Sequence, residues 1–141
     1  MSIGKKVLVG GCFDILHYGH ICFLKEAKKK GNYLTVALES DENTKRLKGP
    51  GRPIHSQKQR REILESLNFV DEVIELPEMK SDEDYKKLVM KIKPSVIAIT
   101  KGDVMKKKKE KYALEIGAKL IEIKKTPGFS STKLARLMNF E

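Results

Sequence analysis

The fold of this chain is decided by the stretch Gly10-Gly11-Cys12-Phe13-Asp14-Ile15-Leu16-His17-Tyr18-Gly19-His20. It follows an apolar, strand-like run, Val7-Leu8-Val9, and precedes apolar residues at helical spacing. The stretch therefore predicts a strand-to-helix junction, in which Gly10 and Gly11 permit positive φ and a close approach of the backbone to a ligand. Because the free N–H groups and the positive dipole end of a helix start attract anions, the junction is a candidate phosphate site.

Two histidines belong to the same junction. His17 and His20 stand three residues apart at the expected first helical turn, so their imidazoles can project to one side of it. Gly19 between them leaves room for a ligand against the backbone. The alternative is an incidental pair beside a glycine turn, but the preceding Phe13-Asp14 and the strand before it favour a functional pair.

The string from Gly11 to His20 resembles the signature of the HxGH nucleotidyltransferase superfamily, in its cytidylyltransferase-like branch. In that family the two histidines contact the nucleoside triphosphate and stabilise the transition state of nucleotidyl transfer. The resemblance thus makes His17 and His20 catalytic candidates. It also makes the surrounding loop the expected nucleotide-binding segment, with Gly10, Gly11, Cys12, Phe13, Asp14 and Gly19 as its candidate residues.

The chain has 141 residues, the usual length of one domain, so we expect a single nucleotidyltransferase domain over residues 1–141. No apolar run approaches the roughly 18–20 residues that cross a bilayer, and the first residues lack the apolar segment of a signal peptide. Cys12 and Cys22 have neither metal-binding spacing nor the setting of a structural disulfide. These features predict a cytoplasmic protein without membrane association.

The net charge of +10 raises the question of nucleic-acid binding. Most of the excess is lysine among glutamates, and the densest run, Lys106-Lys107-Lys108-Lys109, lacks the interleaved aromatic residues of an RNA-binding stripe. We therefore expect a solvated helix face and no nucleic-acid partner. The positive charge would also steer anionic substrates toward the protein.

Strand-like and helix-like segments alternate, which predicts an α/β, Rossmann-like three-layer domain. Right-handed crossovers give a five-stranded parallel sheet of order 3-2-1-4-5. The expected strands are Lys5–Val9, Tyr33–Leu38, Glu72–Leu76, Val96–Thr100 and Lys119–Ile123. The expected helices are about Gly19–Lys30, Asp41–Leu47, one capped by Ser56 and running through Leu67, Asp82–Ile92, a lysine-rich helix ending at Gly117, and one from Ser130 to about Asn139.

In such a sheet, ligands bind beyond the carboxyl ends of the strands, at the switch point between the first and fourth strands. Four segments of unusual composition follow strands in this chain: Gly10–His20, Lys48–Pro53, Lys101-Gly102-Asp103 and Lys125–Lys133. We therefore expect all four to converge on one edge of the sheet.

The segment Thr126-Pro127-Gly128-Phe129-Ser130-Ser131-Thr132-Lys133 is a second candidate anion site. Gly128 permits a turn and Ser130 can cap a helix whose first N–H groups are free for phosphate, although an ordinary serine-capped helix explains the residues equally well. The segment resembles the C-terminal Ser-Thr motif of the family, whose hydroxyls and amides contact nucleotide phosphates. The resemblance implies nucleotide contacts for Thr126, Gly128, Phe129, Ser130, Ser131 and Thr132.

Three basic residues are weighed as phosphate ligands. Lys48 is expected in a glycine-proline loop, where a cation can swing over a substrate. The stretch from His55 to Ile74 resembles glycerol-phosphate cytidylyltransferases, in which the arginine at the position of Arg60 binds substrate or triphosphate. Lys48 and Arg60 are therefore catalytic candidates. Lys125 stands where related enzymes tend to have arginine, and lysine lacks the bidentate fork.

A narrower resemblance is to heptose 1-phosphate adenylyltransferases, the ADP-heptose synthases of lipopolysaccharide-core biosynthesis. It rests on residues 11–20, on Arg-Leu-Lys-Gly-Pro-Gly-Arg-Pro at residues 46–53, on Lys101-Gly102-Asp103 and on residues 128–132. It adds Lys101, Gly102 and Asp103 to the nucleotide-binding candidates. Gly10 in place of the usual Asn and one glycine fewer after Lys101 depart from the pattern, which leaves the substrate open.

The resemblance implies an enzyme that transfers AMP from ATP to a phosphorylated sugar, with release of pyrophosphate. It implies Mg²⁺ as companion of the triphosphate, and no carboxylate cluster suggests a metal site of the protein's own. Family analogy implies a homodimer. Three alternatives stay open: a cytidylyltransferase for glycerol 3-phosphate or another polyol phosphate, an FAD synthetase, and a non-catalytic nucleotide- or RNA-binding module.

Overall fold

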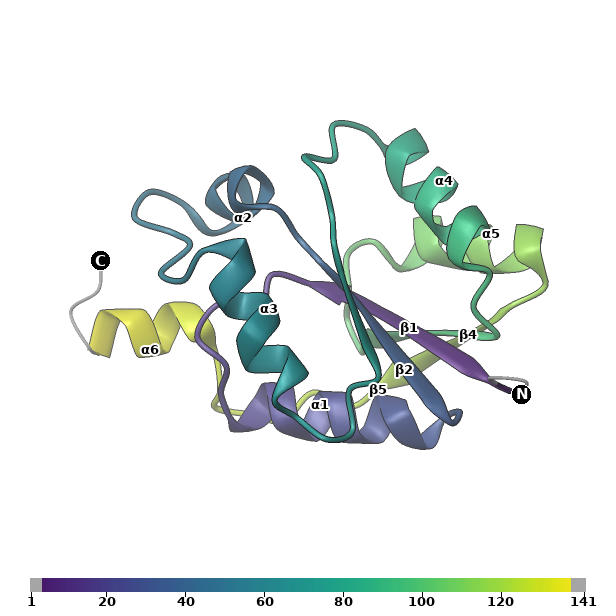
Figure 1. The fold of residues 1–141 in the computed structure, drawn as a ribbon, viewed down its shortest axis with the longest axis horizontal. Helices are drawn as coiled ribbons and strands as arrows, with labels where there is room; N and C mark the ends of the chain where they lie inside the picture. The colour runs from purple at the N-terminus through teal and green to yellow at the C-terminus, as the bar shows by residue number, and fades with distance from the viewer. Residues whose placement is uncertain (1–3, 138–141) are drawn as a thin grey trace.

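The computed structural model describes residues 4–137, and Figure 1 shows one twisted parallel sheet with helices on both of its faces. The strand order is β3-β2-β1-β4-β5, as predicted from the sequence. The strands are β1 (Lys6–Gly11), β2 (Tyr33–Leu38), β3 (Glu72–Glu75), β4 (Val96–Thr100) and β5 (Lys119–Ile123).

Four of the six helices in the described residues lie on the faces of the sheet, and two apolar clusters fix which helix lies on which face, whereas α6 extends away from the sheet (Figure 1). Val7 and Val9 of β1 pack with Leu24 of α1 and Leu64 of α3, whereas Leu8 packs toward the side of α4 and α5. Because both faces of the sheet are covered at its centre, the central strands β2 and β4 are almost entirely apolar, whereas the edge strands β3 and β5 contain charged residues. The helices are α1 (Tyr18–Lys29), α2 (Asp41–Lys48), α3 (Gln57–Glu65), α4 (Asp82–Ile92), α5 (Lys106–Ile116) and α6 (Ser131–Leu137).

Serine side chains cap the starts of four helices, and at α6 the predicted cap Ser130 accepts from the N–H of Lys133 at 3.3 Å. The hydroxyls of Ser40, Ser56 and Ser81 accept hydrogen bonds from backbone N–H groups in the first turns of α2, α3 and α4. The predicted caps at Ser56 and Ser81 are thereby confirmed. Lys48, which we expected in a loop, is instead the last residue of α2, and the predicted end of the final helix at Asn139 lies outside the described residues.

The glycines that end β1 have a different role from the one predicted. Gly10 and Gly11 are extended residues that pair with Ala37 and Leu38 of β2, so neither adopts positive φ. A Cβ on Gly11 would lie 2.9 Å from the ring of Phe13, so this glycine makes room for an aromatic side chain. The left-handed residues of the junction are Phe13 (φ 46°) and Ile15 (φ 61°), which lack the freedom of glycine.

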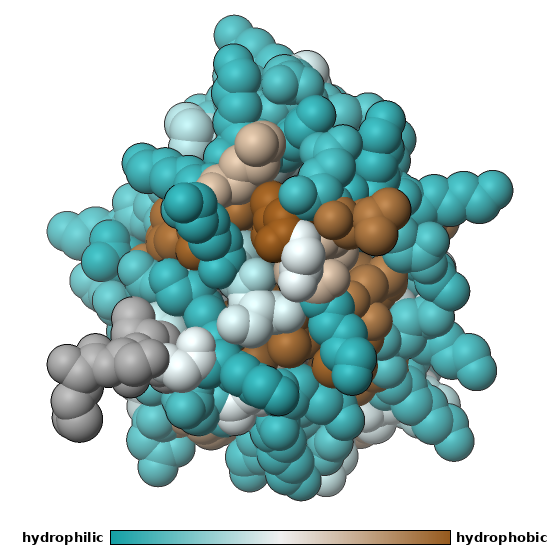
Figure 2. All heavy atoms as spheres, turned by 90° about the vertical axis from the view of Figure 1, so that its right-hand side faces the viewer, coloured by the Kyte–Doolittle hydropathy of each residue, from teal (hydrophilic) through white to brown (hydrophobic). Residues whose placement is uncertain are grey.

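The two ends of the sheet differ in character. Figure 2 shows the end where the strands begin, on which hydrophilic side chains surround small areas of apolar surface. The loops singled out in the sequence lie at the opposite end. In the part of the chain that the structure describes, no helix is long and apolar enough to cross a membrane.

Candidate active site

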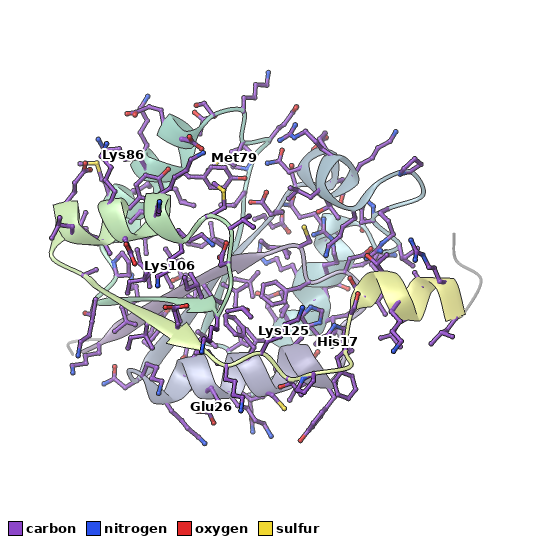
Figure 3. All side chains as sticks on the ribbon, turned by 180° about the vertical axis from the view of Figure 1, so that it is seen from behind. His17, Glu26, Met79, Lys86, Lys106 and Lys125 are labelled. Carbon is purple, nitrogen blue, oxygen red and sulfur yellow. The ribbon has the colours of Figure 1, made fainter. Side chains whose placement is uncertain are left out.

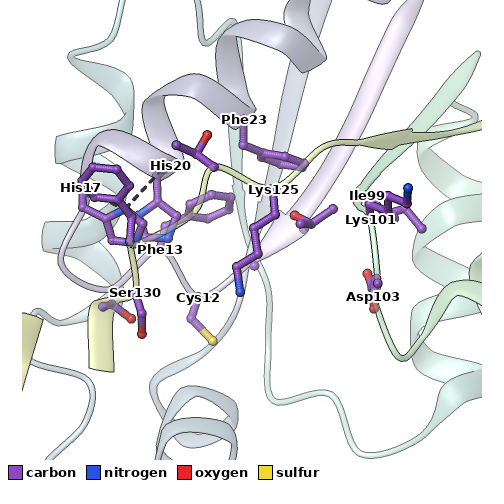
Figure 4. Close-up of a pocket in the computed structure, with 18 of the residues that line it drawn as sticks. Cys12, Phe13, His17, His20, Phe23, Ile99, Lys101, Asp103, Lys125 and Ser130 are labelled. Atoms are coloured by element: carbon purple, nitrogen blue, oxygen red, sulfur yellow. Dashed lines mark hydrogen bonds between the residues drawn. The ribbon is translucent and has the colours of Figure 1, made fainter. Parts of the chain in front are cut away.

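A cavity of about 610 Å³ opens beyond the carboxyl ends of β1 and β4, which is the switch point of the sheet. All four predicted segments contribute to its walls, the Lys48–Pro53 segment through Lys48 alone, and Figure 4 shows labelled residues of the other three. Figure 3 shows His17 and Lys125 at this same end of the sheet, with Lys86 and Lys106 on the side of α4 and α5. The predicted residues that line the cavity are Gly10, Gly11, Cys12, Phe13, His17, Gly19, His20, Lys48, Lys101, Gly102, Asp103, Thr126, Phe129, Ser130 and Ser131.

The histidines form a reciprocal cap at the start of α1. The His20 N–H donates to Nδ1 of His17 at 3.4 Å, and the His17 N–H donates to Nδ1 of His20 at 3.2 Å. The two rings stack with 3.8 Å between their centroids. Because each Nδ1 accepts a hydrogen bond, a neutral ring must hold its proton on Nε2. Each histidine is therefore prepared to donate an N–H to an anion.

Both imidazoles are kept neutral by their surroundings. Burial lowers the pKa of His20 to about 3, assisted by the nearby His17 and Lys48. Burial also lowers the pKa of His17, again with help from the positive charge of Lys48. At neutral pH, the pair can thus offer hydrogen-bond donors but little positive charge.

The depressed pKa of His20 predicts a pH-dependent stability. An unfolded histidine takes up a proton near pH 6.5, whereas folded His20 remains neutral down to about pH 3. The unfolded state binds more protons in this window, so the free energy of unfolding should decrease as the pH falls below about 6.5. Urea unfolding at pH 7 and pH 5 measures the decrease, which should be smaller in His20→Gln. An equal decrease in both proteins would contradict the assignment.

Gly19 and Phe129 also lie close to the ring of His17. The rings of His17 and Phe129 stack with centroids 6.0 Å apart. A Cβ on Gly19 would lie 2.9 Å from Cε1 of His17 and 3.0 Å from Cβ of Phe129. Gly19 therefore allows His17 and the loop before α6 to approach the helix backbone closely, and it still lines the cavity.

Lysines dominate the charge of the cavity. Lys48, Lys101, Lys109, Lys124 and Lys125 line it, and Lys125 extends toward Cys12, between the histidines and Lys101 (Figure 4). Lys109 is paired with Asp103, and the other four ammonium groups give the cavity a positive charge that suits a polyanion such as a triphosphate.

Asp103 is the one carboxylate among the described residues that line the cavity. Its oxygens accept hydrogen bonds from the Lys109 ammonium and the Met105 N–H, each at 2.8 Å. Burial raises the pKa of Asp103, but these two donors outweigh burial and lower the pKa overall. Asp103 is therefore an ionised residue that orders the start of α5. Within residues 4–137 no group of three or more His, Cys, Asp or Glu side chains could hold a metal ion.

Cys12 lines the cavity without the character of a nucleophile. Burial raises the pKa of its thiol, which remains protonated at neutral pH. The cavity thus combines neutral donors and cations around an unreactive thiol, which suits electrostatic stabilisation of a phosphate rather than covalent catalysis.

Four predicted site residues lie outside the cavity lining: Asp14, Arg60, Gly128 and Thr132. Gly128 adopts the positive φ expected of its turn. Arg60 is completely buried and donates to the carbonyl oxygens of Cys12, Glu39 and His55 and to the carboxylate of Asp41. This placement corrects the expected substrate contact of Arg60, which instead holds the β1 and β2 loops in position.

The α5 lysines are largely neutralised by neighbouring acids. Lys106 pairs with Glu122 at 2.7 Å, and Lys108 pairs with Asp82 at 2.8 Å. Lys107 and Lys108 lie on an exposed helix face, as predicted, whereas Lys109 of the same run lines the cavity.

Several cavity residues were absent from the sequence prediction. Ala98, Ile99 and Thr100 end β4, and their place at the switch point was a usable signal. Lys109 and Lys124 had no signal that separates them from the many surface lysines. Arg52 does not line the cavity, and although it belongs to the Lys48–Pro53 segment, nothing in the sequence indicated that its buried side chain would donate to Asp14.

Comparison with known proteins agrees with this geometry. Residues 8–137 match the family model described as Cytidylyltransferase-like. The bifunctional protein HldE of Pseudomonas putida strain F1 is 44% identical over 93 residues, which are 66% of this chain and 19% of that protein. HldE of Pseudomonas entomophila is 44% identical over 91 residues, which are 64% of this chain and 18% of that protein. The chain thus spans about a fifth of the length of these curated relatives.

Solved structures agree with the fold. The lipopolysaccharide core biosynthesis protein from Thermoplasma volcanium superposes with a TM-score of 0.69 at 27% identity, over 87% of this chain and 97% of that one. The pantoate-β-alanine ligase from Francisella tularensis, at 16% identity and a TM-score of 0.62 over 99% of this chain and 73% of that one, shares the fold alone. Because the family model covers nearly the whole chain, this protein belongs to the cytidylyltransferase-like family.

Proposed function

We propose that the protein is a nucleotidyltransferase that transfers AMP from ATP to a phosphorylated sugar, with release of pyrophosphate. The observation that carries the proposal is the pair of neutral histidines, His17 and His20, at a cavity lined by five lysines. The likeness to HldE and to a lipopolysaccharide core biosynthesis protein supports a sugar phosphate as acceptor, in line with the heptose 1-phosphate pattern of the sequence.

The chemistry requires only placement and charge stabilisation. A phosphate oxygen of the acceptor attacks the α-phosphorus of ATP in line, the new P–O bond forms, and the bond from the α-phosphorus to the pyrophosphate oxygen breaks. The Nε2–H groups of His17 and His20 would donate to the phosphate oxygens, while the lysines offset the negative charge of both substrates. The protonated thiol of Cys12 takes no part in a covalent step.

Magnesium belongs to this proposal as part of the substrate. Both oxygens of Asp103 are engaged by protein donors, and the described residues offer no metal-binding cluster. These residues do not fit a metal held by the protein itself. We therefore assign Mg²⁺ to the ATP complex, in which phosphate oxygens and water supply its preferred octahedral ligands.

The charge of the cavity also favours an acceptor without a cationic group. An amino-alcohol phosphate would bring its ammonium group among five lysines, with Asp103 already paired to Lys109. A polyhydroxylated phosphate has no such conflict. The positive charge of the cavity therefore favours sugar and polyol phosphates over choline- or ethanolamine-type acceptors.

The decisive experiment measures pyrophosphate release with ATP, CTP, GTP and UTP in Mg²⁺ buffer. Heptose 1-phosphate, glycerol 3-phosphate and flavin mononucleotide serve as acceptors. We expect ATP with the sugar 1-phosphate to give the highest kcat/KM. Preference for CTP with glycerol 3-phosphate, or for ATP with the flavin, would replace the proposal by the corresponding alternative. If no nucleotide gave pyrophosphate release, and the protein bound RNA equally well with and without ATP, a non-catalytic binding module would be favoured instead.

Lys48 and Lys107 make a matched pair of lysine variants. Lys48 lines the cavity, whereas Lys107 is exposed on α5 and does not line it. Loss of a charge-assisted hydrogen bond lowers kcat/KM, and we expect about a tenfold reduction for Lys48→Ala. Lys107→Ala should retain the wild-type value. The opposite result, with Lys107→Ala inactive and Lys48→Ala normal, would invert the assignment of the basic residues.

Two coarser expectations accompany the proposal. Cys12 and Cys22 are both free thiols, as expected in the reducing cytoplasm, where we place the reaction. We also propose a homodimer, by family analogy. Light scattering of the purified protein tests this, with a monomeric mass as the contrary result.

A further inference from the structure

Arg52 joins three segments that are far apart in the sequence. Its Nε donates to Oδ2 of Asp14 at 2.7 Å, and its Nη2 donates to Oγ of Ser131 at 3.0 Å. Its Nη1 donates to Oγ1 of Thr132 at 3.4 Å. Arg52 thereby connects the histidine loop and the loop after α2 to the beginning of α6.

The ion pair at the centre of this network is fully buried. The side chains of Arg52 and Asp14 are both 0% exposed. Asp14 also accepts hydrogen bonds from the N–H groups of Ile54 (2.8 Å) and His55 (3.1 Å). Burial alone raises the pKa of this carboxyl group, but these donors and Arg52 outweigh it and lower the pKa. The pair is thus a fixed, ionised junction.

Asp14 transmits this constraint to the histidine loop. Its neighbours in the sequence, Phe13 and Ile15, both have left-handed backbones, which side chains of these types adopt only when the surroundings impose them. His17, two residues after Ile15, caps α1. The contacts to Asp14 therefore hold the histidine loop in an otherwise unfavourable conformation.

Ser131 transmits the constraint to the opposite wall. Ser131 lines the cavity, whereas Arg52 and Thr132 do not. The guanidinium group reaches Asp14 and Ser131 at the same time, which a lysine ammonium on a single stem cannot do with the same geometry. The position of Ser131 relative to the histidines thus depends on Arg52.

We infer that Arg52 is a positioning residue for nucleotide binding, which acts through Ser131 and Asp14 to set the separation of the two cavity walls. This inference rests on the proposed function, because it supposes that a nucleotide contacts both walls. Small displacements of contacting groups are costly when a reaction depends on placement. The role predicts a loss of ATP affinity without a comparable loss of folding.

The test is a double-mutant cycle of Arg52→Lys and Ser131→Ala, with the ATP Kd measured by calorimetry and the melting temperature as a second readout. We expect Arg52→Lys to weaken ATP binding about tenfold and to have little further effect in the Ser131→Ala background. Arg61→Lys is the matched control, since Arg61 pairs with Glu65 and Glu75 at the surface. If the two substitutions weakened ATP binding independently, so that their effects on Kd multiplied, Arg52 would not act through Ser131. A lower melting temperature with an unchanged Kd would also overturn the role.

Thr132→Val keeps the test decisive if Arg52→Lys does not fold. Thr132 accepts a hydrogen bond from Arg52 and does not line the cavity. Thr132→Val removes this hydrogen bond, leaves the ion pair of Arg52 with Asp14 in place, and can affect the cavity only through Arg52 and Ser131. We expect about a threefold weaker ATP Kd, and an unchanged Kd would contradict the inference. A wild-type protein that binds ATP but releases no pyrophosphate would overturn the proposed function, while the affinities would still decide the role of Arg52.

Discussion

Replacement of His20 by alanine is expected to reduce turnover by about 10²–10³, the usual cost of losing one donor to a developing phosphate or oxyanion charge. The neutral ring of His20 has its Nδ1 occupied by the N–H of His17, so Nε2–H is the group that is lost to the substrate. Pyrophosphate release at saturating ATP and acceptor measures the effect. The KM values should change less than kcat.

The same experiment at position 17 must separate catalysis from folding, because His17 is the N-cap of α1. His17→Asn keeps a good capping side chain and removes the Nε2–H donor, so it should lose turnover while the melting temperature is nearly retained. The third histidine of the chain, His55, lies outside the cavity lining and gives the control variant His55→Ala. Near-normal turnover of both His17→Asn and His20→Ala would remove the pair from the mechanism.

Arg60→Ala is expected to destabilise the protein by about 3–5 kcal/mol, as when one partner of a buried charge network is removed. The substitution deletes a completely buried side chain and leaves the carbonyl oxygens of Cys12 and Glu39 without their donor. The melting temperature should fall by on the order of 10 °C. Thermal unfolding followed by circular dichroism measures the change.

Arg61→Ala is the matched control for Arg60→Ala. Arg61 is the next residue of α3, but its side chain is 42% exposed and pairs with acids at the surface. Its loss should leave the melting temperature nearly unchanged. If Arg60→Ala melted like the wild type and lost only turnover, Arg60 would be the substrate ligand that the family resemblance implied.

The fold was largely predictable because its determinants are local. β2, β4, β5 and α4 have the predicted bounds, since each is an apolar or amphipathic run ended by glycine, proline, serine or charged residues. The order of the strands followed from alternation and handedness. Strand ends at glycines were harder, and β1 continues through Gly10 and Gly11 because pairing with β2 stabilises their extended backbone.

The place of the cavity followed from the topology of the sheet, but the contacts within it were predictable only where one segment contains both the motif and its chemistry. His17 and His20 act together within one helical turn, so their spacing is visible in the sequence. Arg60 and Arg61 show the limit, because adjacent positions of one helix differ completely in burial. Whether the buried member faces a ligand or backbone carbonyls depends on loops that are distant in the sequence. The role of Arg52 depends on residues up to 80 positions away and has no local signature.

The lysine-lined cavity has a practical consequence for work at the bench. Lys109 is paired with Asp103, but the other four lysines of the cavity lining repel one another until an anion enters, so we expect phosphate or sulfate in a buffer to occupy the site and raise the melting temperature. The same ions will then compete with ATP and make the apparent affinity too weak. A phosphate buffer is therefore suited to purification and storage, because it stabilises the protein. Substrate titrations should be done in an organic buffer with chloride, which leaves the site open to ATP.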